Sequence, residues 1–368
     1  MQTISESNVI NEAQKLQIPQ IQEKETQMLI NSISQNSQQS SIITSNQQNS
    51  QPFTYQLIRQ HSIKQEQLYY AFAVNIDCSI LIAGSYKQIK VFEFIQGILK
   101  QIQKLNEHVQ YIWTLNFMKR SDQFISGSED KTIIIWKKNL NNSWDFQQKL
   151  IGHKGGIVCL LLNNNEDIIV SGSQDKKIKF WQKQNEWMCS QTITNHTNIV
   201  YGLSFNEQQN KLISCAGDSS ILIIEQQEQN KSWIVTQKIT VEQFGYRLCF
   251  IDSNTFTFQP YGKQYINIFQ MNTEKYYIKT KDISVKGGQS DNCFFPQQYI
   301  KSKCMLVNKR NSIVSLIRNK KNGEFITEES IEFGSQDIFG YMTEDGQYLI
   351  TWDNKQREIQ IRKYLEKQ

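Results

Sequence analysis

Two stretches of the chain, Ser126-Gly-Ser-Glu-Asp-Lys-Thr-Ile-Ile-Ile-Trp136 and Ser171-Gly-Ser-Gln-Asp-Lys-Lys-Ile-Lys-Phe-Trp181, are near copies of each other. A weaker copy is Ser214-Cys-Ala-Gly-Asp-Ser-Ser-Ile-Leu-Ile-Ile224, and a shorter one is Ala83-Gly-Ser-Tyr-Lys-Gln-Ile-Lys-Val-Phe92. Each copy places a short polar turn before a run of β-prone residues, the pattern of a strand, a turn and a second strand. Recurrence of one such unit predicts a repeat architecture built from short strands.

The four histidines of the chain follow the same repeat. They are residues 61, 108, 153 and 196, separated by 47, 45 and 43 residues. A period in the low to mid forties is typical of the blades of a β-propeller. Beyond Pro52 the sequence continues as apolar alternation interrupted by Gly, Asp and Asn turns, with no competing helical period.

These residues resemble the WD40-repeat family. A unit of that family opens with Gly-His, carries Ser-Gly-Ser and an Asp turn between its second and third strands, and ends the third strand in Trp-Asp. Gly152-His153 has the full opening, while Trp136-Lys137 and Trp181-Gln182 keep the Trp of the ending. The resemblance implies an all-β, seven-bladed WD40 propeller that binds proteins and is not an enzyme.

The resemblance also implies a hydrogen-bonded chain of His, Ser, Asp and Trp within a blade. The residues that would form these structural networks are His108, Ser126, Asp130 and Trp136; His153, Ser171, Asp175 and Trp181; and His196, Ser214 and Asp218, where Ile224 replaces the Trp. A catalytic site is needed once, whereas these sets recur in successive blades. We therefore predict no catalytic residue, and we find no P-loop, HExxH or CxxC pattern that would predict a metal or a cofactor.

The blade count follows from length. Residues 53–368 number 316, or about 45 for each of seven blades. The expected blades are 62–100, 101–149, 150–192, 193–238, 239–286, 287–332 and 333–368. The last of these ends after a third strand, and 53–59 has the aromatic-led pattern of an outer strand. We therefore expect 53–59 to close the ring as the missing outer strand of the last blade.

Residues 1–52 have a different composition, rich in Gln, Ser and Asn. Such a segment buries too little apolar surface to offset the entropy of ordering it, which predicts a disordered tail. A short partner-docking helix within 16–30, interrupted near Pro19, is the alternative. No signal peptide and no apolar run of membrane-spanning length is evident, so we expect a soluble protein without membrane insertion.

Charge and cysteine content restrict the function further. Lys plus Arg is 40 and Asp plus Glu is 35, and the lysines are scattered, so nucleic acid is not an expected partner; a lipid headgroup is a less favoured alternative. Seven cysteines without a CxxC pair suit a reducing compartment. We expect a cytoplasmic protein, with a nuclear location as the alternative, present as one propeller within a larger complex.

Aromatic residues recur where the first strand of a blade begins, which in the family lies at the narrow end of the central channel. Aligned on the strand pattern these positions are Tyr70, Trp113, Val158, Tyr201, Tyr246 and Phe339, flanked by the turn residues Tyr86, Glu129 and Gln174. Two interpretations stay open. The rings form a partner-binding rim, or they fill the core and the channel wall.

The sequence thus predicts a non-catalytic scaffold or adaptor that holds protein partners on the channel end of the propeller. The alternative is a subunit of one specific assembly. Cytosolic iron–sulfur protein assembly, a ubiquitin-ligase adaptor and a transport or coat complex are the candidates, by analogy with other members of the family.

Overall fold

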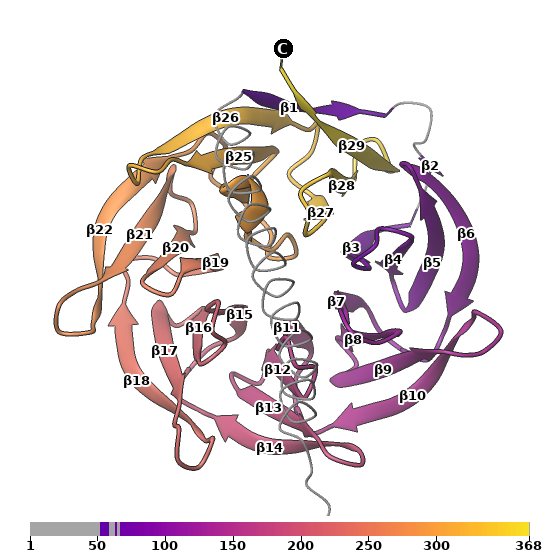
Figure 1. Cartoon of the computed structure of the whole chain (residues 1–368), viewed down its shortest axis with the longest axis horizontal. Coiled ribbons are helices and arrows are strands. Elements are labelled where there is room, and N and C mark those ends of the chain that lie inside the picture. Colours follow the sequence, from indigo (N-terminus) through magenta and orange to yellow (C-terminus); the bar gives the residue numbers. More distant parts are fainter. Residues whose placement is uncertain (1–51, 59–62, 65–66, 368) are drawn as a thin grey trace, which may run out of the picture. The chain divides into compact units, whose positions relative to one another are not determined.

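The computed structural model describes residues 52–58, 63–64 and 67–367, and Phe53–Gln368 form one compact unit. Seven antiparallel sheets surround a central channel, each with its first strand innermost (Figure 1). The predictions for residues 1–51 and for His61 lie outside the described residues. No helix in the described part of the chain is long and apolar enough to cross a membrane.

Each of the first three blades contains four strands. Blade 1 contains β3 (Tyr69–Val74), β4 (Ile80–Ser85), β5 (Gln88–Ile95) and β6 (Ile98–Leu105). Blade 2 contains β7 (Ile112–Phe117), β8 (Gln123–Ser128), β9 (Thr132–Lys138) and β10 (Trp144–Ile151). Blade 3 contains β11 (Ile157–Leu162), β12 (Ile168–Ser173), β13 (Ile178–Lys183) and β14 (Trp187–Ile193).

The next three blades repeat this arrangement. Blade 4 contains β15 (Val200–Phe205), β16 (Lys211–Ala216), β17 (Ser220–Gln226) and β18 (Trp233–Thr240). Blade 5 contains β19 (Gly245–Asp252), β20 (Thr255–Pro260), β21 (Tyr265–Met271) and β22 (Tyr277–Ser284). Blade 6 contains β23 (Gln298–Ile300), the short 3₁₀ helix η2 (Lys301–Lys303), β24 (Met305–Arg310), β25 (Ile313–Asn319) and β26 (Phe325–Glu332).

Blade 7 combines the two ends of the described chain. It contains β27 (Ile338–Met342), β28 (Tyr348–Asp353), β29 (Glu358–Glu366), β1 (Phe53–Leu57) and β2 (Ile63–Lys64). β1 pairs antiparallel with the end of β29, from Phe53 opposite Glu366 to Leu57 opposite Arg362, and β2 pairs with its start. Two N-terminal segments therefore lie along the outer edge of β29, which would otherwise expose unpaired backbone groups.

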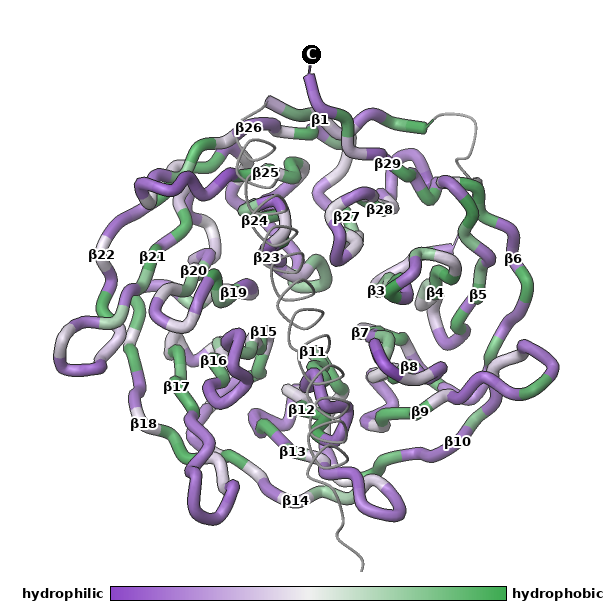
Figure 2. The backbone as a smooth tube through the Cα atoms, in the orientation of Figure 1, coloured by the Kyte–Doolittle hydropathy of each residue, from purple (hydrophilic) through white to green (hydrophobic). Residues whose placement is uncertain are grey.

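The observed strands differ from the expected blade limits in two respects. The expected limits after residues 100, 149, 192 and 238 fall inside β6, β10, β14 and β18, and residues 63–64 pair with blade 7 and not with blade 1. The outer strands are partly exposed and mix polar with apolar residues, as the colours of Figure 2 illustrate. For that reason their ends carry less sequence signal than those of the buried inner strands.

The glycines of the repeated hairpins explain how neighbouring blades pack. A Cβ on Gly127 of β8 would lie 2.7 Å from Cγ2 of Ile157 in the next blade, and a Cβ on Gly172 would lie 2.7 Å from Cγ1 of Val200. The absent side chain lets the first strand of one blade press against the second strand of the preceding blade. The hydrophobic core therefore lies between the blades, where each sheet buries both faces.

Glutamines on the outer strands bind the next blade along the ring. Gln148 donates to the carbonyl oxygen of Trp187 at 3.0 Å and accepts from the amide of the same residue at 3.0 Å. The same two-bond amide clamp joins Gln103 to Trp144, Gln191 to Trp233 and Gln237 to Tyr277. These clamps satisfy backbone groups that an outer strand would otherwise leave unpaired.

Glu329 takes the corresponding place at the point where the ring closes. Its carboxylate accepts from the amide of Tyr55 and from the hydroxyl of Thr54, each at 2.8 Å. β1 is thus held by pairing with β29 on one side and by a charged acceptor from blade 6 on the other.

Candidate functional site

The histidine networks lie within blades 2, 3 and 4. In blade 3, His153 Nε2 lies 2.7 Å from Ser171 Oγ and Nδ1 lies 2.9 Å from Asp175 Oδ2, while Trp181 Nε1 donates to Ser171 Oγ at 2.9 Å. Blade 2 repeats this arrangement with His108, Ser126, Asp130 and Trp136. Blade 4 keeps the bonds among His196, Ser214 and Asp218.

Burial shapes the electrostatics of these networks. Burial would raise the pKa of Asp175, but hydrogen bonds from His153 and from the Lys154 amide outweigh it and lower that pKa to about 2. Burial lowers the pKa of His196, and the neighbouring Asp218 carboxylate offsets this only in part. Each serine is fully buried and already holds its partners, so it is not presented to a substrate. Each network is therefore a buried structural support within its own blade.

The candidate rim positions share a backbone feature. In blades 1 to 5 the register of the first strand shifts by one residue, and the extra residue is Tyr70, Trp113, Val158, Tyr201 or Tyr246. A β-bulge leaves one residue outside the ladder and redirects its side chain. These five positions are therefore equivalent because each is the bulge residue of its blade.

Phe339 is different. β27 has no bulge, Phe339 pairs in register with Trp352, and its side chain is only 3% exposed. It contributes to the hydrophobic core between blades 7 and 1, where it meets the Tyr70 ring with 5.1 Å between centroids. The rim interpretation is wrong for Phe339, because without a bulge its side chain stays inside the sheet packing.

The bulge residues are joined by aromatic rings that the strand alignment did not include. Rim cluster 1 is defined by Tyr70, Tyr86, Tyr111, Trp113 and Phe294. Phe294, from the loop before β23, lies 5.4 Å from both the Tyr70 and Trp113 rings, centroid to centroid. Phe294 thus connects the loop before blade 6 with blades 1 and 2.

Rim cluster 2 is defined by Tyr201, Phe244, Tyr246 and Tyr261, from blades 4 and 5. Tyr201 and Tyr246 meet edge to face at 4.7 Å, and Phe244 stacks on Tyr261 at 5.0 Å. Tyr111 and Phe244 lie just before a first strand, a signal that the sequence alignment could have used. Phe294 carried no such signal because β23 is only three residues long.

A cavity of about 280 Å³ occupies the channel. The first strands line it, and four bulge residues, Tyr70, Trp113, Tyr201 and Tyr246, contribute their rings; Val158 contributes the one small bulge side chain. All four rings are partly exposed. They therefore border the channel and remain partly accessible.

The three predicted turn residues differ in exposure. Tyr86 is 45% exposed, Glu129 is half-buried and Gln174 is exposed. The amide of Ile112 donates to the carbonyl oxygen of Tyr86, and the amide of Glu129 donates to that of Tyr111, each at 2.8 Å. Gln174 accepts from the Gly156 amide at 3.2 Å in blade 3. Tyr86 and Glu129 thus belong with rim cluster 1.

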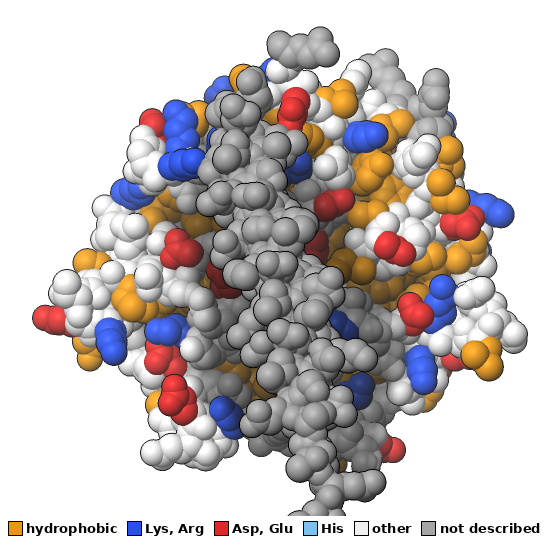
Figure 3. Space-filling model, viewed as in Figure 1, with side chains coloured by type: hydrophobic (Ala, Val, Ile, Leu, Met, Phe, Trp, Pro, Cys, Tyr) orange, Lys and Arg blue, Asp and Glu red, His pale blue; other side chains and the backbone are white. Residues whose placement is uncertain are grey.

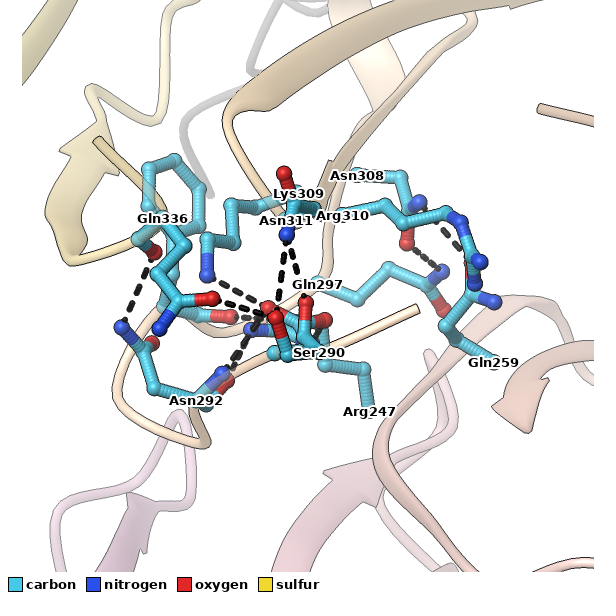
Figure 4. A network of polar contacts seen from close by, with 12 residues as sticks. Arg247, Gln259, Ser290, Asn292, Gln297, Asn308, Lys309, Arg310, Asn311 and Gln336 are labelled. Atoms are coloured by element: carbon cyan, nitrogen blue, oxygen red, sulfur yellow. Dashed lines mark hydrogen bonds and ion pairs between the residues drawn. The ribbon is translucent and has the colours of Figure 1, made fainter. Parts of the chain in front are cut away.

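Blades 5 and 6 hold an ion cluster in place of a histidine network (Figure 4). Arg247 donates to Asp291 at 2.6 Å and to the carbonyl oxygen of Phe295 at 2.6 Å, and the Lys309 ammonium binds the same carboxylate. All three side chains are at least nine-tenths buried. Burial lowers the pKa of Lys309 to about 8, with Asp291 opposing the shift. The cluster orders the 285–297 loop that carries Phe294.

A second polar chain extends this region. Gln297 donates to Asn308 at 2.7 Å, and Asn308 donates to Gln259 at 3.1 Å. Arg310 donates to the carbonyl oxygens of Gly262 and Lys263. The sequence analysis did not identify these residues, because their contacts occur at one place in the ring and do not recur in the other blades.

On the described surface visible in Figure 3 both basic and acidic side chains are present, and hydrophobic side chains gather over blade 1. All seven cysteines are free thiols. In the part of the chain that the structure describes, no group of three His, Cys, Asp or Glu side chains could hold a metal ion.

Fold and site together define a seven-bladed β-propeller with an aromatic-lined channel. Comparison with known families identifies the repeats: the family "WD domain, G-beta repeat" matches residues 99–137, 144–182 and 187–225. Each match spans one outer strand and the first three strands of the next blade. The chain thus contains three WD40 repeats within a seven-bladed β-propeller.

One known protein with a similar segment is the Intraflagellar transport protein 122 homolog of Danio rerio. The two are 32% identical over 100 residues, which is 27% of this chain and 8% of the relative. The chain thus corresponds to a small part of that protein's length.

Proposed function

We propose that this chain is a non-catalytic scaffold that binds protein partners where rim clusters 1 and 2 border the channel. The observation that carries the proposal is the set of four β-bulges that place Tyr70, Trp113, Tyr201 and Tyr246 around one cavity. Large, partly exposed rings on a rigid frame are the usual anchors of protein interfaces. WD40 propellers as a family typically bind other proteins, which agrees with this assignment.

Replacing Trp113 and Tyr201 by Ala tests the proposal. We expect the double variant to lose most of the proteins that co-purify with the full chain, because both anchors are removed. Phe146→Ala is the matched control, since Phe146 is 48% exposed on β10, away from the channel. Both variants are compared with the parent chain by thermal melting and quantitative mass spectrometry.

An unchanged partner set for Trp113→Ala/Tyr201→Ala would overturn the proposal. A fall in melting temperature with partners retained would assign the rings to the channel wall alone.

Membership of a transport complex is the second candidate, and the similarity to an intraflagellar transport protein favours it over the other assemblies. Affinity purification from the native cell, followed by native mass spectrometry, tests it. Recovery of the chain within one stoichiometric set of transport subunits is the expected result. A mixture of unrelated partners, each at low occupancy, would contradict it and leave the general scaffold role.

A further inference from the structure

Blade 3 interrupts the aromatic border of the channel. Its bulge residue is Val158, whereas the bulge residues of blades 1, 2, 4 and 5 are Tyr70, Trp113, Tyr201 and Tyr246. Among the described residues, no contact between rings joins rim cluster 1 to rim cluster 2. Between the two clusters, blade 3 thus contributes an aliphatic side chain to the channel cavity in place of a ring.

The backbone that leads to Val158 also lacks a ring. Gly156 stands two residues before Val158, where blade 2 has Tyr111 and blade 5 has Phe244. A Cβ on Gly156 would lie 2.6 Å from Cζ3 of Trp113. The Trp113 ring therefore lies against the backbone of blade 3, and Trp113 and Val158 both line the cavity.

The lining of the cavity leaves little for a charged occupant to bind. Its charged and amide side chains already have partners within the protein. Arg247 pairs with Asp291 and Glu344 with Lys119, while Asn116, Gln297 and Gln298 donate to Leu160, Asn308 and Met342. A charged side chain would lose its hydration there without gaining a free counter-ion, whereas an apolar one would gain contact with rings and aliphatic chains.

The volume of the cavity restricts the size of the occupant. At about 280 Å³ the cavity is several times larger than the roughly 30 Å³ that one water takes up in the liquid. It is also smaller than the pockets of about 300–1,000 Å³ that usually hold a whole small molecule. The cavity therefore suits one large side chain whose backbone stays outside it.

We propose that the channel cavity receives one large apolar side chain of a protein partner, such as Leu or Phe, which enters beside Val158 between Trp113 and Tyr201. This inference rests on the proposed function and names the chemistry of the partner. Val158 is the specificity-determining residue, because a ring at this position, as in the neighbouring blades, would occupy the space that the partner side chain needs.

Fluorescein-labelled decapeptide pools test this inference with the full chain. Each pool has a fixed central residue, Leu, Phe, Arg, Glu or Gly, and randomised flanking positions; binding is measured by fluorescence anisotropy at low and physiological salt. We expect the Leu and Phe pools to bind about tenfold more tightly than the Gly pool, because burial of a large apolar side chain is worth at least that factor. At physiological salt the Arg and Glu pools should bind no more tightly than the Gly pool.

Two variants of Val158 locate the effect. Val158→Phe gives blade 3 a ring and should reduce the binding of the Leu and Phe pools to that of the Gly pool. Val158→Thr keeps the shape of the side chain but places a hydroxyl in the cavity, and should weaken the same pools about threefold. Ile234→Phe is the matched control, because Ile234 is 40% exposed on the outer strand β18. Thermal melting verifies that each variant is folded.

Equal binding of the Leu and Gly pools would overturn the inference, and so would tightest binding of the Arg pool. A preference for Leu and Phe that survives in folded Val158→Phe would also overturn it; if that variant does not fold, an unchanged preference in Val158→Thr has the same meaning. Failure of the inference and failure of the proposed function are distinguishable. If Trp113→Ala/Tyr201→Ala still loses native partners while the pools bind equally, the scaffold assignment stands and only the apolar anchor is excluded.

Discussion

In blades 2, 3 and 4 a histidine, a serine and an aspartate bind one another within a single sheet, whereas in blades 5 and 6 the ion cluster joins two sheets. The bonds of the first group link residues 22, 18 or 10 positions apart. Arg247 and Asp291 are 44 positions apart, and Glu329 reaches Tyr55 across 274 positions. The histidine networks thus stabilise single sheets, whereas the ion cluster and the Glu329 contact hold neighbouring sheets together.

This difference predicts where the ring is vulnerable. A network within a blade supports its own sheet and can fail locally. A contact between blades supports closure, so its loss affects two sheets at once.

Removing β1 should have the largest effect. A chain that begins at Ile58 loses Phe53 and Tyr55, both almost fully buried, and with them about 3–6 kcal/mol of unfolding free energy. A chain that begins at Pro52 keeps β1. Urea denaturation of the two truncations against the full chain measures the difference. Equal midpoints for the two would show that β1 does not close the ring.

Asp291→Ala should rank next. It leaves Arg247 and Lys309 buried without a counter-charge, which costs about 3–5 kcal/mol. Lys301→Ala, at an exposed ion pair with Glu207, is the control and should change stability by less than about 1 kcal/mol. If the two variants unfold at similar urea concentrations, the cluster is not the support of blades 5 and 6.

His153→Ala should cost less, about 2–3 kcal/mol, because it leaves the Asp175 carboxylate short of a partner inside one blade. Hydrogen exchange should then rise mainly in β11 to β14. Exchange that rises equally in all seven blades would contradict local support.

The contact of Glu329 with β1, which closes the ring, can be compared with the amide clamp of Gln148 between two ordinary blades. Glu329→Ala removes the acceptor of Tyr55 and Thr54 and should cost about 1.5–3 kcal/mol, while Gln148→Ala, at an ordinary neutral clamp, should cost about 1–2 kcal/mol. Glu329→Gln keeps one acceptor in place and should fall between the parent and Glu329→Ala in thermal melting. A larger loss of unfolding free energy in Gln148→Ala than in Glu329→Ala would reverse this ranking.

Stability should also depend on pH. The pKa of His196 is lowered in the fold, so its contribution is present above the unfolded value of 6.5 and is lost as pH falls below it. Lys309 titrates near 8 in the fold and 10.5 unfolded, so stability rises with pH between these values. Melting temperatures measured from pH 5 to 10 test both assignments. The change in stability at acidic pH should be absent in His196→Gln, and the change at alkaline pH should be absent in Lys309→Met. A pH-dependent change that persists in the corresponding variant would refute that assignment.

The sequence by itself determined the repeat, and with it the propeller and the histidine networks. His153, Ser171, Asp175 and Trp181 belong to one blade, so their spacing is fixed by strand and turn lengths and recurs in the chain. It also marked four of the rings at the channel, because the bulge falls at the same place in the first strands of blades 1, 2, 4 and 5.

Only the tertiary structure decided which residues of different blades contact one another. The approach of Phe294 to Trp113, the ion cluster of blades 5 and 6 and the burial of Phe339 depend on how separate blades face one another. The amide clamps between blades recur along the chain, but the contacts of Phe294 and of the ion cluster occur once in the ring and so leave no periodic trace in the sequence. The opening of the channel, assembled from several blades, is therefore visible only once the ring has closed.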